Sequence, residues 1–149
     1  IPELEDADLK ALLERVTDYI AHRTSDKVKI STHVPDSLPP VRLNVALFEW
    51  VIENLCKNAV DAMGGVGVLV ISVQETSRYW CIDVADTGKG IDKRYFETVF
   101  APGYTTKKRG WGLGLSLARR IVVEYHSGSI FVKQSEINKG TIFRIELKK

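Results

Sequence analysis

The chain has 149 residues, enough for one domain with its own hydrophobic core. Apolar residues make up 44% and charged residues 27%, and 21 basic against 19 acidic side chains leave a net charge of +2. So weak an excess does not argue for nucleic-acid binding, which needs a clustered basic surface, and no apolar run is long enough to span a membrane. We therefore expect a globular domain that contacts neither nucleic acid nor membrane directly.

The first residue and the two cysteines bear on the parent protein and on its cellular compartment. It begins with Ile1 and has no signal peptide, so we expect residues 1–149 to be one domain of a longer protein, whose membrane topology the sequence leaves open. Cys56 and Cys81 lie in apolar runs and form no C-x-x-C pair. We expect buried free thiols in a reducing compartment, which favours the cytoplasm.

The first half of the chain predicts two helices with a strand between them. Apolar residues at helical spacing indicate a helix over 9–20, and strict alternation indicates a half-buried strand over 28–34. Prolines at 35, 39 and 40 predict irregular structure up to Asn44, a good N-cap. An apolar stripe then predicts a second helix, which Gly64-Gly65 ends.

The second half predicts further strands and a third helix. β-rich runs at 67–74 and 79–85 precede a glycine-rich stretch with a short helix expected over 92–99. Periodicity is absent until a helix over 113–125, and a hairpin is expected over 129–147. The third helix is expected to turn inward Leu117, Ala118, Ile121, Val122 and Tyr125.

This order of elements indicates an α+β fold. Strands in adjacent pairs favour a mixed, largely antiparallel sheet of five strands, covered by three helices in a two-layer sandwich. A doubly wound parallel sheet would need strict alternation of strands and helices, which is missing.

The second helix carries a polar stripe opposite its apolar one. Asn54, Asn58 and Asp61 share a face, because residues four apart lie about 40° apart around a helix, and Lys57 lies beside them. Most such stripes are solvated faces. Asparagine, however, is a poor helix former whose neutral oxygen suits a hard cation such as Mg²⁺.

Two glycine-rich turns are candidates for nucleotide contacts. Residues 86–91 (DTGKGI) follow a strand directly, so the Asp86 carboxylate can accept a hydrogen bond from a ligand on bare backbone. Residues 110–115 (GWGLGL) open the third helix, where backbone N–H groups can approach a phosphate. The alternatives are a plain turn and a tightly packed N-cap.

Other nucleotide-binding motifs are excluded. The P-loop pattern G-x-x-x-x-G-K-[ST] does not occur. A G-x-G-x-x-G fingerprint would need glycine at Leu115 or at Lys93. The triplet at 22–24 is not the H-R-D of protein kinases, and no D-F-G occurs.

Taken in order, these segments resemble the GHKL superfamily, and within it the catalytic domain of sensor histidine kinases. The matching segments are 54–63 (N box), 86–91 (G1 box), 96–100 with 105–107 (F box and ATP lid), 110–115 (G2 box) and Gly140-Thr141. Four boxes in order at plausible spacing are a specific signal, and they cover essentially the whole chain.

The resemblance implies a Bergerat-type fold that holds ATP and Mg²⁺ between the helical layer and a mobile lid. It implies that Asp86 accepts a hydrogen from the adenine amine and that Asn58 ligates the metal. Asn54 and Lys57 would support the phosphate region, and Lys107 or one of its basic neighbours would reach the γ-phosphate. The G1-box glycines would make room for the base, and the G2-box glycines would cradle the phosphates. The remaining nucleotide contacts implied are Asp61, Gly88, Gly90, Ile91, Tyr104, Thr105, Thr106, Gly110, Trp111, Gly112, Leu113, Gly114, Leu115 and Thr141.

Trp111 departs from the family pattern, which usually places Thr or Ser between the first two glycines of the G2 box. A side-chain hydroxyl contact to phosphate is therefore lost, whereas the backbone cradle is kept. Trp111 would instead cover the nucleotide or pack under the lid.

Branches of the superfamily differ in their reaction. The ATPases need a general base, normally a glutamate one turn before the metal-binding asparagine, and here Asn54 takes that position, with Glu53 rotated about 100° away. A histidine acceptor needs no such base, since neutral imidazole is already nucleophilic. This favours a histidine kinase, with a GHKL ATPase, an anti-sigma-type serine kinase and a nucleotide-binding pseudokinase as alternatives.

The phosphorylated histidine is not expected in this chain. In the family it lies on a dimerising helical hairpin, before an acidic and then an apolar residue. His22, His33 and His126 lack this context and are expected to be surface or packing residues. The expected partners are ATP, the phosphoacceptor helical hairpin of the same kinase and a downstream response regulator.

Overall fold

The computed structural model describes residues 2–104 and 114–149. Its elements are β1 (Glu5–Ala7), α1 (Leu9–His22), β2 (Val28–His33), β3 (Val41–Leu43), α2 (Val45–Met63), β4 (Gly67–Glu75), β5 (Tyr79–Asp86), the 3₁₀ turns η1 (Lys93–Tyr95) and η2 (Thr98–Phe100), α3 (Gly114–Arg120), a π-helical turn (Ile121–Tyr125), β6 (Ser129–Glu136) and β7 (Gly140–Lys148). None of the described helices is long and apolar enough to cross a membrane.

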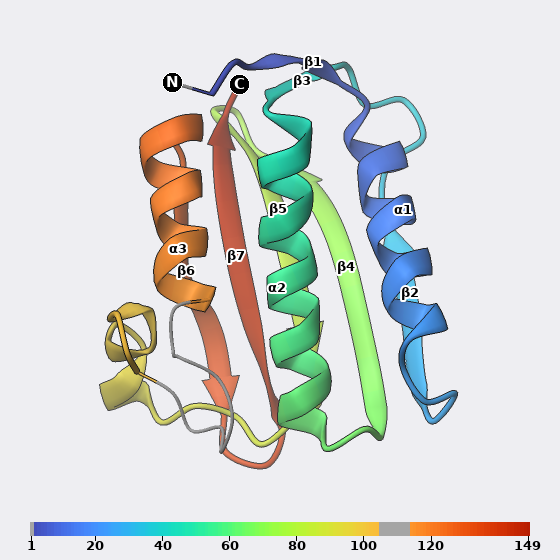
Figure 1. Cartoon of the computed structure of the whole chain (residues 1–149), viewed down its shortest axis with the longest axis vertical. Coiled ribbons are helices and arrows are strands. Elements are labelled where there is room, and N and C mark those ends of the chain that lie inside the picture. The colour runs from blue at the N-terminus through green and yellow to red at the C-terminus, as the bar shows by residue number, and fades with distance from the viewer. Residues whose placement is uncertain (1, 105–113) are drawn as a thin grey trace.

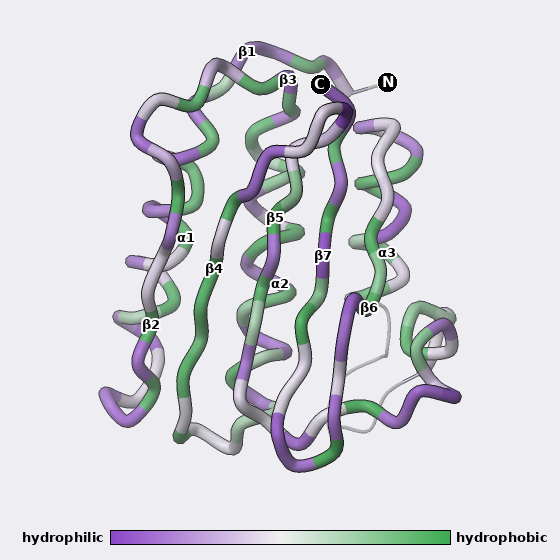
Figure 2. The backbone as a smooth tube through the Cα atoms, turned by 180° about the vertical axis from the view of Figure 1, so that it is seen from behind, coloured by the Kyte–Doolittle hydropathy of each residue, from purple (hydrophilic) through white to green (hydrophobic). Residues whose placement is uncertain are grey.

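The main sheet has five strands in the order β2-β4-β5-β7-β6. β2 and β4 are parallel, and the other neighbours are antiparallel. The helices α1, α2 and α3 cover one face (Figure 1), and no described element covers the other face (Figure 2). The predicted α+β sandwich with a mixed sheet and three helices is confirmed.

The core lies between the sheet and the helices. Alternate residues of β4, among them Leu69 and Ile71, are fully buried, and they face an α2 stripe that includes Phe48 and Ile52. Each such side chain contributes about 1.5–3 kcal/mol when it leaves water. Cys56 is free and buried, as expected of both cysteines, and burial raises the pKa of its thiol to about 12.

β1 and β3 form a separate two-stranded antiparallel ribbon at one end of the molecule (Figure 1). The expectation of irregular structure up to Asn44 is therefore wrong. Pro40 comes just before the paired residues, so its missing N–H interrupts no hydrogen-bonded pair. Val41 and Leu43 on either side of Arg42 are buried, and this burial draws the segment into a strand.

The short helix expected over 92–99 is replaced by η1 and η2. Asp92 does act as a cap, since its side chain accepts a hydrogen bond from the Arg94 amide at 3.1 Å. Contacts with α3 set the conformation of the remaining residues of this segment. Arg119 of α3 pairs with Glu97 and lies 3.9 Å from the centre of the Phe100 ring. Such contacts override a local helical preference.

α3 continues into the π-helical turn, so the third helix is present but changes its winding. Ala118, Ile121 and Val122 are buried as expected, and Tyr125 is half-buried. Leu117 is 41% exposed, so its expected inward orientation is wrong. It lies about 100° around the helix from Ala118, at the margin of the buried face.

His126 ends the π-helical turn and is a packing residue, as expected. Its Nε2 accepts a hydrogen bond from the Asn44 amide at 3.1 Å, so Nδ1 carries the proton, which it donates to the Ile121 carbonyl at 3.0 Å. The ring packs edge-on against Phe48, with centroids 5.5 Å apart. The side chain therefore joins the third helix to the start of α2.

We expect His126→Ala to lower the free energy of unfolding by about 2–4 kcal/mol, because it leaves two backbone groups without partners and opens a space beside Phe48. Urea unfolding followed by circular dichroism measures this change. His33→Ala, an exposed histidine on β2, is the control and should change stability by no more than about 0.5 kcal/mol. Equal losses in the two variants would contradict the structural role of His126.

Candidate functional site

Several of the described segments singled out in the sequence lie close to one another near the end of β5. The segment after β5 passes beneath the end of α2, since the Lys89 amide donates to the Ala62 carbonyl at 2.9 Å. It then crosses the β6–β7 turn, where the Asn138 amide donates to the Lys89 carbonyl at 2.7 Å. Asn54 of α2 lies against Gly114, the first residue of α3. One end of the sandwich thus brings these segments together (Figure 1).

Asp86 is the last residue of β5 and is only 8% exposed. Its carboxylate accepts a hydrogen bond from the Gly88 amide at 2.8 Å. Burial raises the pKa of the Asp86 carboxyl above its ordinary value, and the amides of Gly88 and Thr141 offset part of this rise. A carboxylate with so little water around it is a strong acceptor for an N–H donor of a ligand.

The glycines after Asp86 are needed for close backbone contacts. A Cβ on Gly88 would lie 2.6 Å from the Ala62 carbonyl oxygen, and one on Gly90, whose φ is +77°, would lie 2.2 Å from the Glu136 carbonyl oxygen. The resemblance implied that these glycines make room for the base. The structure adds a packing reason, because a side chain at either position would push the loop off α2 or off the β6–β7 turn.

Thr141 lies directly opposite Asp86 in the pairing of β7 with β5, so both side chains lie on the helix-facing side of the sheet. Its hydroxyl oxygen is 2.7 Å from that of Ser135, which also accepts a hydrogen bond from the Ile91 amide at 2.7 Å. Ser135 is a residue that the sequence patterns missed. Ser135 lies in the polar end of β6, between Gln134 and Glu136, so its neighbours along the chain provided no signal.

The polar stripe of α2 divides by exposure. Asn54 and Asn58 are half-buried, whereas Lys57 and Asp61 are exposed. A Cβ on Gly114 would lie 2.6 Å from the Asn54 side-chain oxygen, so glycine lets α3 begin against this asparagine. The stripe is therefore partly covered by α3 and is not a plain solvated face.

The hydrogen bonding of the Asn54 side chain bears on whether the site fits ATP. Its amide nitrogen is buried and has no hydrogen-bond partner in the described part of the chain. Leaving a buried N–H unsatisfied costs about 1–3 kcal/mol, so an acceptor from a ligand or from water is favoured there. A phosphate oxygen supplies such an acceptor, and the residues present fit a nucleotide phosphate.

The metal-binding prediction concerns Asn58 alone. Among residues 2–104 and 114–149, no three His, Cys, Asp or Glu side chains cluster as a metal site. Mg²⁺ does not need such a cluster, because it binds through one or two side chains together with phosphate oxygens and water. The half-buried Asn58 side chain, one turn along α2 from Asn54, fits that mode.

Part of the predicted site lies outside the described residues: Thr105, Thr106, Lys107, Lys108, Arg109, Gly110, Trp111, Gly112 and Leu113. On one side of this gap, Tyr104 stacks on Tyr95 with centroids 6.4 Å apart. On the other side, Leu115 is partly buried against the core. Arg119 ties the two sides together through Glu97, Phe100 and the Ile130 carbonyl, to which it donates at 3.1 Å.

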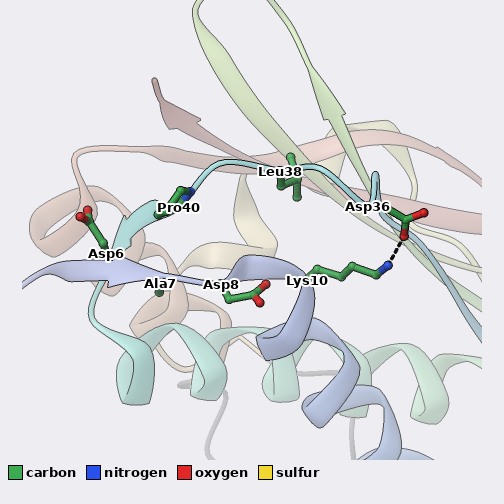
Figure 3. A pocket seen from close by; sticks show the side chains of 7 residues that line it. All are labelled: Asp6, Ala7, Asp8, Lys10, Asp36, Leu38 and Pro40. Atoms are coloured by element: carbon green, nitrogen blue, oxygen red, sulfur yellow. Dashed lines mark hydrogen bonds and ion pairs between the residues drawn. The ribbon is translucent and has the colours of Figure 1, made fainter.

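A hollow of about 270 Å³ lies beside β1, away from the residues described above. It is lined by Asp6, Ala7, Asp8, Lys10, Asp36, Leu38 and Pro40 (Figure 3). Its charges have structural roles, since Asp8 caps α1 by accepting from the Ala11 amide at 3.0 Å, and Lys10 pairs with Asp36. We assign it no part in nucleotide binding.

A two-layer sandwich with a buried acceptor at a strand end and, within the described residues, an unpartnered donor on the facing helix is suited to a nucleotide. The family model for histidine kinase-, DNA gyrase B-, and HSP90-like ATPases (HATPase_c) matches residues 44–149. The chain belongs to this family.

Curated relatives narrow the class. Sensor histidine kinase ZraS of Escherichia coli (strain K12) is 32% identical over 145 residues, which are 97% of this chain and 31% of that protein. Sporulation kinase C of Bacillus subtilis (strain 168) is 37% identical over 97 residues, 65% of this chain and 22% of that protein. The chain thus spans about a third or less of the length of these relatives.

Solved structures agree. The catalytic domain of histidine kinase ThkA, in a nucleotide-free form, superposes with a TM-score of 0.85 at 26% identity, covering 99% of this chain and 97% of that chain. Full-length ShkA in complex with AMPPNP gives 0.87 at 25% identity, covering 97% and 30%. The prediction of a histidine-kinase catalytic domain is confirmed.

Proposed function

We propose that this domain binds Mg-ATP and transfers the γ-phosphate to a histidine on the dimerisation and phosphoacceptor hairpin of the same kinase, in two-component signal transduction. The observation that carries the proposal is Asp86, a buried carboxylate at a strand end, which faces Thr141 and has backbone amides around it. The names of the relatives support the reaction class.

The candidate site residues are given the following roles in this proposal. The Asp86 carboxylate accepts a hydrogen bond from the exocyclic amine of adenine. The Asn54 side chain donates a hydrogen bond from its unpartnered N–H to a phosphate oxygen. Asn58 would hold Mg²⁺, which neutralises charge on the phosphates, and the exposed Lys57 adds a positive charge at their edge. Lys107 or a basic neighbour is proposed to meet the γ-phosphate.

The position of Glu53 favours a kinase over an ATPase. Glu53 and Cys56 are three residues apart and so lie on one side of α2, whereas Asn54 is rotated about 100° from Glu53. The residue that faces Gly114 is Asn54, whose amide cannot take a proton from water. Transfer to an imidazole needs no such base.

The remaining partners and the compartment are part of the same proposal. A response regulator would take the phosphate from the hairpin. Histidine kinase ThkA has been solved in complex with the response regulator protein TrrA, and its fold matches with a TM-score of 0.84 at 24% identity. We place the domain in the cytoplasm, because Cys56 and Cys81 are free and buried. This placement holds equally for a membrane-anchored parent protein and for one without an anchor.

The experiment is to incubate the domain with γ-labelled ATP, with and without the parent's hairpin, and to divide the product between acid and base. We expect label only when the hairpin is present, in a bond that base preserves and acid destroys, as a phosphoramidate does. Transfer should be slow, because separate molecules lack the effective concentration of a tether.

Each other outcome contradicts the proposal in a different way. Rapid phosphate release by the domain alone would indicate an ATPase. An acid-stable label would indicate a serine kinase, and tight ATP binding without any transfer would indicate a pseudokinase.

A further inference from the structure

β6 contains a bulge that changes which of its residues face the helices. Val132 pairs with Phe143, but Gln134 pairs with the next residue of β7, Ile142, so Lys133 is an extra residue. Before the bulge the even-numbered Val132 is buried. After it the odd-numbered Ser135 takes that face, directly opposite Thr141.

Without the bulge, alternation along β6 would place the Ser135 side chain on the open face of the sheet. The bulge places the Ser135 side chain on the helix-facing side instead, beside the proposed nucleotide site. Bulges beside functional sites commonly re-aim a side chain in this way. The Ser135 hydroxyl is therefore brought inward at the cost of regular pairing.

The hydrogen bonds of Ser135 fix the direction of each proton. Its single O–H lies 3.0 Å from the Gly140 carbonyl, which can only accept, so Ser135 donates there. Its oxygen accepts the Ile91 N–H at 2.7 Å. The remaining contact, 2.7 Å to the Thr141 hydroxyl oxygen, is then made by the Thr141 proton. This is the only arrangement that makes all three bonds.

Thr141 is left as an acceptor. Its proton is engaged by Ser135, and within residues 2–104 and 114–149 no group donates a hydrogen bond to its oxygen, on the face that it shares with Asp86. The Asp86 carboxylate also only accepts when ionised. Two adjacent acceptors suit a ligand edge that offers donors, such as the 6-amino group of a purine, and they disfavour a 6-oxo group.

We propose that Ser135 is a positioning residue that holds Thr141 as a hydrogen-bond acceptor beside Asp86, and that this arrangement discriminates 6-amino from 6-oxo purine nucleotides. The inference rests on the proposed ATP site and adds to it the source of its base selectivity. Ser135 acts through Thr141 and the Ile91 amide and need not touch the nucleotide.

The test compares the affinities of ATP and ITP, which carries a 6-oxo purine, by calorimetry with Mg²⁺ on the whole domain. Ser135→Ala should reduce the preference for ATP over ITP about fivefold, because the Thr141 hydroxyl becomes free to rotate and donate. Ser135→Thr, which keeps a hydroxyl, should retain most of the preference. Ser129→Ala, on the same strand near Glu146, is the matched control and should not change it.

A second variant keeps the test decisive if Ser135→Ala folds poorly. Thr141→Val removes the hydroxyl that Ser135 positions, with little change of shape, and should reduce the preference to a similar extent. The double variant should then add nothing, because both changes act through one hydroxyl. An unchanged ATP-to-ITP ratio in Thr141→Val would overturn the inference.

A purely structural role predicts a different pattern. In that case Ser135→Ala would lower the affinities for ATP and ITP equally, together with the melting temperature, and the inference would be wrong. Failure of the wild-type domain to bind ATP would overturn the proposed function itself. Normal ATP binding with an unaltered ratio would overturn only the role of Ser135.

Discussion

Asp86→Asn is expected to weaken ATP binding about 10- to 150-fold, because a hydrogen bond to a charged group contributes about 1.5–3 kcal/mol. Calorimetric titration of the folded variant with ATP measures the loss. Asp92→Asn is the control, since Asp92 belongs to the same loop, caps η1 and pairs with Arg94, and it should leave ATP affinity unchanged. An unaltered ATP affinity in folded Asp86→Asn would remove Asp86 from the site.

The same variant should not lose stability at neutral pH. Burial raises the pKa of Asp86 in the folded state above its unfolded value, so the stability that this carboxyl contributes is present at acidic pH and is lost as pH rises through the folded pKa. A neutral asparagine avoids that loss. Urea unfolding at pH 7 is expected to show a free energy equal to or above that of wild type, which would mark Asp86 as kept for binding and not for folding.

Asn58→Ala is expected to reduce the magnesium-dependent part of ATP affinity by about 10- to 100-fold or more, since loss of even an outer-sphere partner of a bound metal costs this much. ATP affinity measured with Mg²⁺ and with a chelator separates this part from the rest. Asn58→Asp should rescue poorly, because a new negative charge lies close to the phosphates.

Gln74→Ala is a suitable control for Asn58→Ala, because it removes an exposed side-chain amide near the end of β4. It should leave the magnesium dependence intact. If Asn58→Ala shows the same magnesium dependence as wild type, the metal is held by another residue.

The sequence predicted those elements that long periodic patterns specify. The alternation in β4 and the apolar stripe of α2 each extend over many residues, so packing against the core and local pattern agree. The three-residue strands of the β1–β3 ribbon were missed, because so short a segment carries almost no period of its own. Its pairing depends on a partner more than thirty residues away along the chain.

The candidate site, like the fold, could be predicted where a local pattern specifies the residue, and it could not where distant contacts do. Asp86 and the glycines after it could be proposed from the sequence, because a strand-end carboxylate and close backbone approach need those residue types. Ser135 was missed because its orientation depends on the extra residue Lys133, and no feature of the local pattern places a bulge there. Leu117 was misplaced for a related reason, since an apolar residue at the margin of a helix face is ambiguous without the neighbouring elements.

Both chain ends lie at one end of the sandwich, and β5 runs from there toward the opposite end (Figure 1). The Lys149 amide donates to the Arg78 carbonyl, just before β5, whereas Asp86 ends that eight-residue strand, a distance of about 25 Å along it. Asn44, which binds the Glu3 carbonyl near the other end, precedes Asn58 by about 21 Å along α2. A fluorescent label, an affinity tag or a sensor surface attached at either terminus therefore leaves the proposed nucleotide site in free solution. ATP binding measured on the immobilised domain should then match binding measured in the cell of a calorimeter.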